Sequence, residues 1–262
     1  MFSQQEQAPP VSPVAITRSS RRAPRQWACA PFLCMAWLLS TPAQAAPDHS
    51  TFDGILQAVV RDERVDYEKV KSDHLPVLNA YLDHLARGKP AETTRDELLA
   101  FYINLYNATM IKAVVDRGGS AFRPSDNDFA VFKEPLVRID GKLLSLNALE
   151  NDVIRKEFSD PRIHAALVCA AVSCPPILSR AYRADDLDDV LTANTKRWLN
   201  DKNRNEIDRP SKTLKLSRIF DWYNIDFGGS EKLVEYVQQY VDEDVANFKV
   251  EFKEYDWTLN KK

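Results

Sequence analysis

The sequence predicts a single α+β domain that is mostly helical and carries a small antiparallel sheet. Several segments between residues 52 and 241 space their apolar residues at helical intervals. Only 7 of 262 residues are glycine, which suits a helix-rich domain. Two β-like runs flank a tight turn within residues 137–144, and residues 250–257 alternate in polarity, so both are expected to supply strands.

The first 45 residues have the layout of a secretory signal peptide. Arginines 18, 21, 22 and 25 precede an apolar run over residues 27–39 and an Ala-Gln-Ala sequence at 43–45. A retained membrane anchor is the alternative, but a spanning helix needs about 20 apolar residues. We therefore expect a mature domain over residues 46–262, located in the periplasm or secreted, with no membrane span.

The charge of the predicted mature domain argues against two kinds of main partner. Residues 46–262 hold 31 basic and 37 acidic side chains, a formal charge of about −6. This balance disfavours nucleic acid and anionic membranes as main partners, which leaves an envelope substrate or a protein partner. No segment resembles a phosphate-binding glycine loop or a dinucleotide fingerprint, so no cofactor is expected.

The first half of the mature domain is expected to be mainly helical. Helices are predicted behind a Ser50-Thr51 cap and over residues 75–85. A third helix begins at a capping box formed by Thr94 and Glu97 and is apolar on every side over residues 98–111, which is typical of a core helix.

Two asparagines interrupt this apolar helix. Asn104 and Asn107 are three residues apart and therefore share a face. Each amide needs hydrogen-bond partners when buried. The pair indicates either a polar network that serves a site or a structural brace between loops and core.

A carboxylate also falls in an apolar position. A hairpin over residues 137–144 turns at Asp140-Gly141, and a helix is predicted over about 146–158. At 100° per residue, Glu150 lies within the apolar arc of that helix. Such a carboxylate is either functional or paired with a base, for which Arg155 and Arg162 are candidates.

The almost uncharged residues 162–176 hold the remaining candidates. They contain His164, Cys169 and Cys174 and end in a double proline. Residues 163–172 are predicted to be a buried strand or a short helix, between which periodicity does not decide. Cys174 follows a turn and is better placed than Cys169 to approach His164.

The rest of the chain supplies a helix over 187–199, a strand near 214–217, a helix behind Ser230 and the final strand. Residues 219–227 form an aromatic cluster that we interpret mainly as core.

Three chemistries compete for these residues. The first is nucleophilic catalysis, with Cys174 or Cys169 as thiolate, His164 as base and Glu150 or Asn107 as the orienting group. The second is a structural Cys169–Cys174 disulfide, favoured by an oxidising compartment and contributing about 2–3 kcal/mol at most. The third is a metal site, but the spacing matches no strong zinc signature.

In order along the mature chain, the motifs resemble the DUF547 family of uncharacterised domains. The residues that carry the resemblance are 101–108 (FYINLYNA), 149–150 (LE), 160–164 (DPRIH), Cys169, 173–176 (SCPP), 219–223 (IFDWY), 226–227 (DF) and 255–260 (YDWTLN). One departure is visible, because Asn151 stands where family members often carry histidine. The resemblance implies an exported protein, similar in layout to papain-like and transglutaminase-like cysteine hydrolases.

We therefore expect a thiol-dependent hydrolase or acyl transferase acting on an amide or ester. Cys174 is the expected nucleophile and His164 the base, while Glu150, Asn104 and Asn107 orient the base or stabilise an oxyanion. The alternative is a non-catalytic envelope or interaction module in which Cys169 and Cys174 form a structural disulfide.

Overall fold

The computed structural model describes residues 48–89 and 93–262, which belong to one compact unit. The predicted signal peptide, residues 1–45, lies outside the described residues. The α-helices are α1 (Ser50–Val59), α2 (Tyr67–Lys69), α3 (Leu75–Leu85), α4 (Arg95–Asp116), α5 (Asp126–Lys133), α6 (Leu146–Ala148), α7 (Arg155–Phe158), α8 (Leu187–Leu199), α9 (Ile219–Trp222) and α10 (Leu233–Gln238). The 3-10 helices are η2 (Gly119–Ala121), η4 (Pro161–Ala165), η5 (Ala184–Asp186) and η6 (Asn224–Phe227), and the π-helices are η1 (Val70–His74) and η3 (Leu149–Ile154).

The strands form three small sheets, which confirms the predicted α+β class. The strands are β1 (Val60–Arg61), β2 (Arg64–Val65), β3 (Pro135–Ile139), β4 (Lys142–Ser145), β5 (Glu206–Asp208), β6 (Thr213–Leu216) and β7 (Lys249–Phe252). The pairs β1–β2 and β3–β4 are antiparallel ribbons. In the three-stranded sheet, β5 runs antiparallel to β6 and β7 runs parallel to it.

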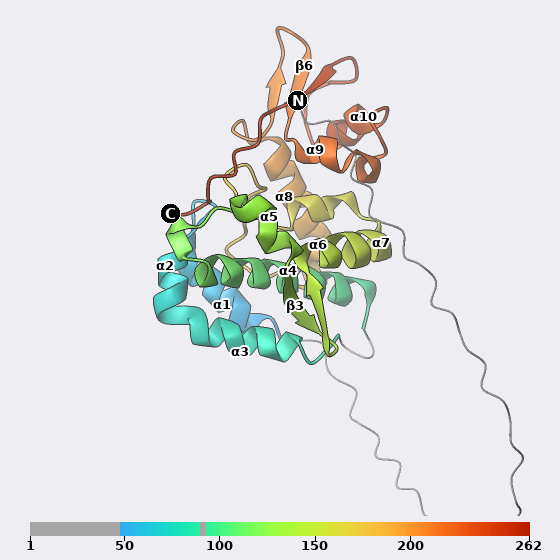
Figure 1. Cartoon of the computed structure of the whole chain (residues 1–262). Coiled ribbons are helices and arrows are strands. Elements are labelled where there is room, and N and C mark those ends of the chain that lie inside the picture. The colour runs from blue at the N-terminus through green and yellow to red at the C-terminus, as the bar shows by residue number, and fades with distance from the viewer. Residues whose placement is uncertain (1–47, 90–92) are drawn as a thin grey trace, which may run out of the picture. The chain divides into compact units, whose positions relative to one another are not determined.

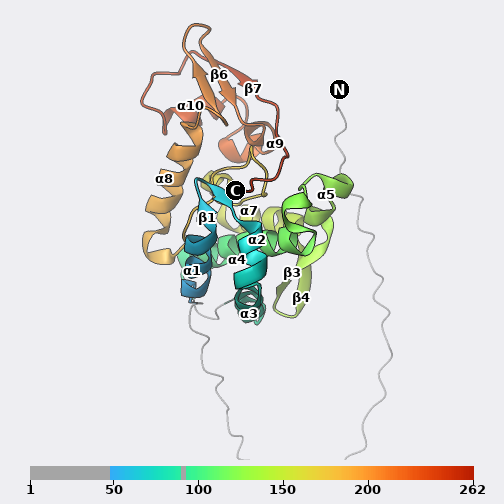
Figure 2. The same ribbon diagram turned by 90° about the vertical axis from the view of Figure 1, so that its left-hand side faces the viewer.

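Helix α4 is the centre of the larger hydrophobic core, as its all-round apolar character predicts. It lies between α1, α3 and the β3–β4 hairpin on one side and α8 with the three-stranded sheet on the other (Figures 1 and 2). Its length and composition match those of a membrane span, but 94% of its most apolar window is buried within the protein. Burial of this kind identifies a core helix.

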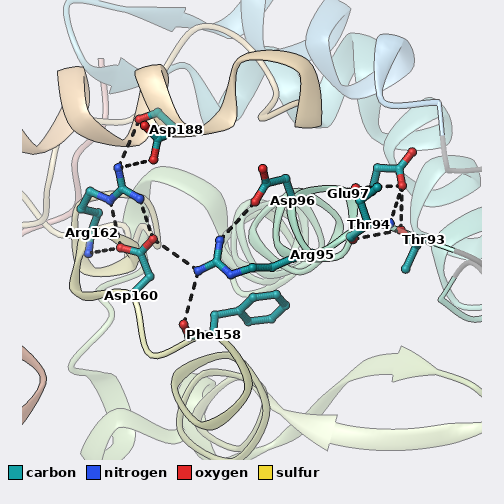
Figure 3. Close-up of polar contacts among 9 residues, drawn as sticks. All are labelled: Thr93, Thr94, Arg95, Asp96, Glu97, Phe158, Asp160, Arg162 and Asp188. Atoms are coloured by element: carbon teal, nitrogen blue, oxygen red, sulfur yellow. Dashed lines mark hydrogen bonds and ion pairs between the residues drawn. The ribbon is translucent and has the colours of Figure 1, made fainter.

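A network of charged side chains fixes the start of α4 against the segment that carries His164 (Figure 3). The predicted capping box is present, because Thr94 Oγ1 accepts from the Glu97 backbone and Glu97 Oε2 accepts from Thr94 N. Arg95, the first residue of α4, lies 3.6 Å from the buried Asp160 carboxylate, which binds Arg162 with two hydrogen bonds. Arg162 also binds Asp188 of α8 at 2.7 Å.

This network ties η4 to two helices, to α4 through Arg95 and to α8 through Asp188. Burial alone would raise the pKa of Asp160, but hydrogen bonds and charge from Arg162 lower it, so the carboxylate stays ionised. Arg162 is thereby engaged away from Glu150, which removes it as the predicted ion-pair partner of that residue.

Three predicted details are wrong. The N-cap of α1 is His49 rather than Ser50, whose hydroxyl binds Asp48. Residues 163–172 form neither one strand nor one helix, because η4 ends at Ala165. The residues that follow bind the side chain of Asn107 and the backbone of residues 258–260. The final strand stops at Phe252, because residues 256–260 leave the sheet to pair with the loop at 170–173.

A second, smaller hydrophobic core lies beneath the three-stranded sheet. It packs α8, α9 and α10 against β6 around Trp198 and Phe220, whose rings stack with centroids 4.6 Å apart. Tyr255 packs against both cores. The junction of the two cores is where the chemically interesting residues gather.

Candidate functional site

A pocket of about 380 Å³ opens at the junction of the two cores. Its walls hold seven aromatic side chains from α4, α5, α9 with the residue that follows it, and the segment near the C-terminal end: Tyr106, Phe129, Phe132, Trp222, Tyr223, Tyr255 and Trp257. Its polar lining includes Glu150, His164, Cys169 and Cys174. Four of the six side chains predicted for the site therefore border one pocket.

The thiol-bearing loop is shaped by the segment near the C-terminal end. Val172 N donates to Thr258 O at 2.8 Å, Ser173 N donates to Asp256 O at 3.2 Å, and Asn260 N donates to Ala170 O at 2.9 Å. Ala170 adopts a φ of 63°, a left-handed conformation that costs a non-glycine residue about 1–2 kcal/mol. These backbone bonds hold Ala170 in that conformation and bring Tyr255 next to Cys169.

The two cysteines are free thiols in contact with each other. Their sulfur atoms are 2.7 Å apart, which is longer than the roughly 2.05 Å of a disulfide bond. The backbone N–H of Cys169 donates to Cys174 Sγ, and the Tyr255 hydroxyl lies 3.1 Å from Cys169 Sγ. The predicted disulfide stays a prediction, between partners that lie side by side.

The surroundings of Cys169 and Cys174 shift the pKa values of these two thiols in opposite directions. Burial by itself would raise the pKa of Cys169, but hydrogen bonds from Cys174, Tyr255 and the backbone of Ala171 lower it. The pKa of Cys174 is raised well above its ordinary value by burial and by the neighbouring Cys169. Cys174 is only 1% exposed, whereas Cys169 is partly exposed. The more available thiolate therefore belongs to Cys169, not to Cys174.

His164 is oriented by a carboxylate that the sequence interpretation did not include. His164 Nε2 lies 2.7 Å from Asp226 Oδ2, and the imidazole packs on Tyr223 with ring centroids 4.2 Å apart. Burial would raise the pKa of Asp226, but hydrogen bonds from His164 and Arg155 lower it, so Asp226 is ionised. An ionised carboxylate only accepts hydrogen bonds, so Nε2 of His164 carries a proton and Nδ1 is the basic nitrogen of the neutral ring.

Arg155 completes this arrangement. Its guanidinium binds both oxygens of Asp226, at 2.6 and 2.7 Å, and also binds Asn151. A bidentate pair of this kind fixes the carboxylate plane. Arg155 is thus engaged with Asp226 rather than paired with Glu150.

Glu150 lies at the pocket wall and is 7% exposed, which confirms its predicted position in the apolar arc. It lies on the π-helix η3, a helix type that occurs frequently at functional sites. Tyr106 donates its hydroxyl to Glu150 Oε2 at 3.2 Å. The pKa of Tyr223 is raised by burial and by the charge of Glu150 and a hydrogen bond to it. Two tyrosines therefore hold this carboxylate, and His164 has Asp226 as its partner instead.

Asn104 and Asn107 do not line the pocket. Asn104 binds both the N–H and the C=O of Tyr182, and Asn107 binds Ala166 O and Val168 N, each at 2.7–2.9 Å. Both ends of each amide are engaged with buried backbone. Asn107 thus holds the segment that joins His164 to Cys169, which is a bracing contact.

Asp226, Tyr255 and Trp222 were missed by sequence reasoning. Asp226 and Trp222 stand in the aromatic run 219–227, which was interpreted mainly as core, yet Trp222 is 48% exposed at the pocket. The available signal was charge, because Asp221 and Asp226 interrupt the aromatic run, but charge alone does not distinguish between them. Among residues 48–89 and 93–262, no group of three or more His, Cys, Asp and Glu side chains is arranged to hold a metal ion.

In structural terms this is an α+β protein with a pocket that is lined by two adjacent thiols. A comparison with family models assigns a family to part of the chain. Residues 90–199 match the family model described as "Protein of unknown function, DUF547". This match supports the DUF547 assignment that the motifs predict, over the part of the chain that it covers. The matched span holds Glu150, His164 and both cysteines, while Asp226 and Tyr255 lie beyond it.

The other two comparisons add nothing to this family assignment. Neither the curated proteins nor the solved structures include a significant match.

Proposed function

We propose that this protein is a thiol-dependent hydrolase or acyl transferase acting on an amide or ester, with Cys169 as the nucleophile. The observation that carries the proposal is the Cys169 thiol, which faces a pocket and has its pKa lowered by hydrogen bonds from its neighbours. The thiolate is the nucleophilic form of cysteine, so a lowered pKa raises its reactive fraction near neutral pH. We assign this role to Cys169 in place of Cys174, which is buried and has a raised pKa.

His164 is proposed as the acid–base group. It is the imidazole among the pocket-lining residues, and Asp226 and Arg155 fix its orientation and tautomer. A carboxylate that orients a histidine and stabilises its imidazolium is the arrangement used in nucleophilic triads. Asp226 takes the orienting role for which Glu150, Asn104 and Asn107 were candidates.

The proposed reaction has two balanced steps. Cys169 Sγ attacks the substrate carbonyl, and His164 takes up the thiol proton. His164 then returns that proton to the leaving nitrogen or oxygen as its bond to carbon breaks, which leaves a thioester on Cys169. Water or an acceptor amine attacks the thioester and gives a proton to His164, and Cys169 leaves as the thiolate.

A burst experiment with p-nitrophenyl acetate tests the nucleophile. The reduced protein is expected to release one equivalent of nitrophenol rapidly, and mass spectrometry should find the acetyl group on Cys169. Cys169→Ser should lose the burst by on the order of a thousandfold or more in rate. Cys174→Ser is the matched control, and it should keep the burst because its hydroxyl still donates a hydrogen bond.

Two outcomes would overturn the proposal. One is an equal burst in Cys169→Ser, and the other is no acylation of the fully reduced protein. The second outcome, with an intact mass that is low by two hydrogen atoms before reduction, would support the non-catalytic envelope module instead. The observation that favours that alternative is the 2.7 Å separation of the two sulfur atoms.

We also propose that the protein is exported and works in the periplasm or outside the cell. The support is the arrangement of arginines, apolar run and Ala-Gln-Ala in residues 1–45. The test is the N-terminal sequence of protein recovered from the periplasm or the medium. A chain that begins at residue 46 or 47 is the expected result, and an intact leader on cytoplasmic protein would contradict it.

A further inference from the structure

Glu150 is a buried carboxylate at the wall of an aromatic pocket, with no cationic side chain from the described residues in direct contact. Among residues 48–89 and 93–262, no Lys, Arg or His nitrogen lies within ion-pair distance of its carboxylate. Arg155 is bound to Asp226 and acts on Glu150 only through the longer-range attraction of its charge. Arg162 is bound to Asp160 and Asp188, and Lys133, which also lines the pocket, is bound to Asp128 at 2.6 Å. The hydrogen bonds that hold Glu150 come from neutral hydroxyls.

A carboxylate buried in this position has lost most of its contact with water. Removing a charge from water is unfavourable unless an opposite charge or strong hydrogen bonds offset the loss. Tyr106 and Tyr223 supply hydrogen bonds but no opposite charge. A carboxylate accepts about four hydrogen bonds, so it retains acceptor capacity towards a bound group.

The pocket walls favour the same kind of ligand. Trp222, Trp257 and Tyr255 form a contiguous aromatic wall, with ring centroids 4.5–5.8 Å apart. Aromatic faces attract an ammonium or guanidinium group, tryptophan most strongly, by about 0.5–2 kcal/mol each. The walls also offer apolar contact to the alkyl chain that carries such a group.

We propose that this pocket binds a positively charged organic group of the substrate, an alkylammonium or alkylguanidinium, with Glu150 as its counter-ion and the tryptophan–tyrosine wall around its chain. The substrate class is then an acyl compound or acyl acceptor with a lysine-like or arginine-like side chain. That the cation belongs to the substrate rests on the proposed function, whereas the cation site itself does not.

Glu150 and Cys169 are also close enough to influence each other. The charge of Glu150 raises the pKa of Cys169. A bound cation offsets this charge and therefore increases the thiolate fraction when the pocket is filled. Occupancy of the cation site would thus be reported by the reactivity of Cys169, independently of turnover.

The test measures binding of n-butylammonium by quenching of tryptophan fluorescence, with n-butanol as the neutral ligand of similar size. Glu150→Gln should raise the Kd of n-butylammonium at least tenfold. Asp152→Asn, an exposed acidic residue of η3 paired with Lys156, should leave it unchanged. n-Butanol should bind at least tenfold more weakly than the ammonium ion.

The outcomes separate this inference from the proposed function. Equal affinity for n-butanol, or unchanged n-butylammonium binding in folded Glu150→Gln, overturns the cation site. The comparison of the two ligands uses the wild-type protein, so the inference is tested even where Glu150→Gln does not fold. Cys169→Ser should still bind n-butylammonium, so a failure of thiol chemistry leaves the cation site standing, and loss of binding only in Glu150→Gln leaves the nucleophile standing.

Discussion

The buried polar groups of helix α4 and those of the pocket differ in how completely their bonding capacity is used. Asn104 and Asn107 each engage both amide atoms with buried backbone. In the pocket, Glu150 has hydrogen bonds but no cationic side chain among the described residues within ion-pair distance, and Cys169 is a thiol surrounded by donors. Saturated polar groups contribute to stability, and unsaturated ones retain capacity for a ligand or a reaction.

Replacing Asn107 should have the largest effect, and the effect should be on stability. Asn107→Ala leaves the buried Ala166 C=O and Val168 N–H without partners, at about 1–3 kcal/mol each. We expect the free energy of unfolding to fall by about 2–4 kcal/mol in urea titration. The exposed Asn203→Ala should stay within about 0.5 kcal/mol of wild type. An equal loss of unfolding free energy in both variants would contradict a bracing role for Asn107.

The next effect concerns another buried polar group outside the pocket, His49, whose Nδ1 lies 2.7 Å from the Tyr81 hydroxyl. Burial lowers the pKa of His49 from 6.5 to about 4. The unfolded chain therefore binds the extra proton between these two values, and stability is lost as the pH falls from 6.5 to 4.

We expect the wild type to lose roughly 2–3 kcal/mol more across this window than His49→Gln does. Gln keeps an acceptor for Tyr81 but does not titrate. Urea titrations at pH 7 and pH 4 give the comparison. Parallel losses in both proteins would show that His49 does not titrate as described.

Replacing Tyr255 should change reactivity and not stability. Tyr255→Phe removes the hydroxyl 3.1 Å from Cys169 Sγ, so the pKa of Cys169 should rise. A hydrogen bond to a charged group contributes about 1.5–3 kcal/mol, so alkylation by iodoacetamide at pH 6 should slow about tenfold or more. Tyr67→Phe, which removes a buried hydroxyl bound to Asn260, is the control and should leave the rate unchanged. Similar rates for all three proteins would contradict a role for Tyr255.

The smallest effect is expected from Glu150→Gln on the same alkylation rate. Removing this charge lowers the pKa of Cys169, since the carboxylate raises it. An interaction of about 1 kcal/mol corresponds to roughly fivefold faster alkylation at pH 6. Asp152→Asn should have no effect. A slower rate in Glu150→Gln would show that the carboxylate assists the thiolate rather than opposing it.

The parts of the fold that were predicted correctly depend on residues close together in the sequence. The capping box at Thr94, the all-apolar α4 and the Asp140-Gly141 hairpin each lie within one continuous segment of at most 23 residues. The burial of Glu150 followed from helical periodicity, although η3 is a π-helix. Local chemistry determines such elements, so a single sequence suffices.

The parts of the site that were missed depend on contacts between distant residues. Tyr255 reaches Cys169 across 86 positions, and Asp226 reaches His164 across 62. The relative acidity of two adjacent thiols is likewise set by groups that only the fold brings near them. The papain-like or transglutaminase-like layout stays a prediction.

The distance in sequence between Cys169 and Tyr255 also has a consequence for biosynthesis. A ribosome adds about 5–20 residues per second, so roughly 4–17 s separate the synthesis of these two residues. During that interval the nascent chain lacks the segment that closes the thiol loop and fills the pocket wall. Cys169 is then an ordinary cysteine next to another, and it gains its distinct chemistry only when residues 255–260 arrive.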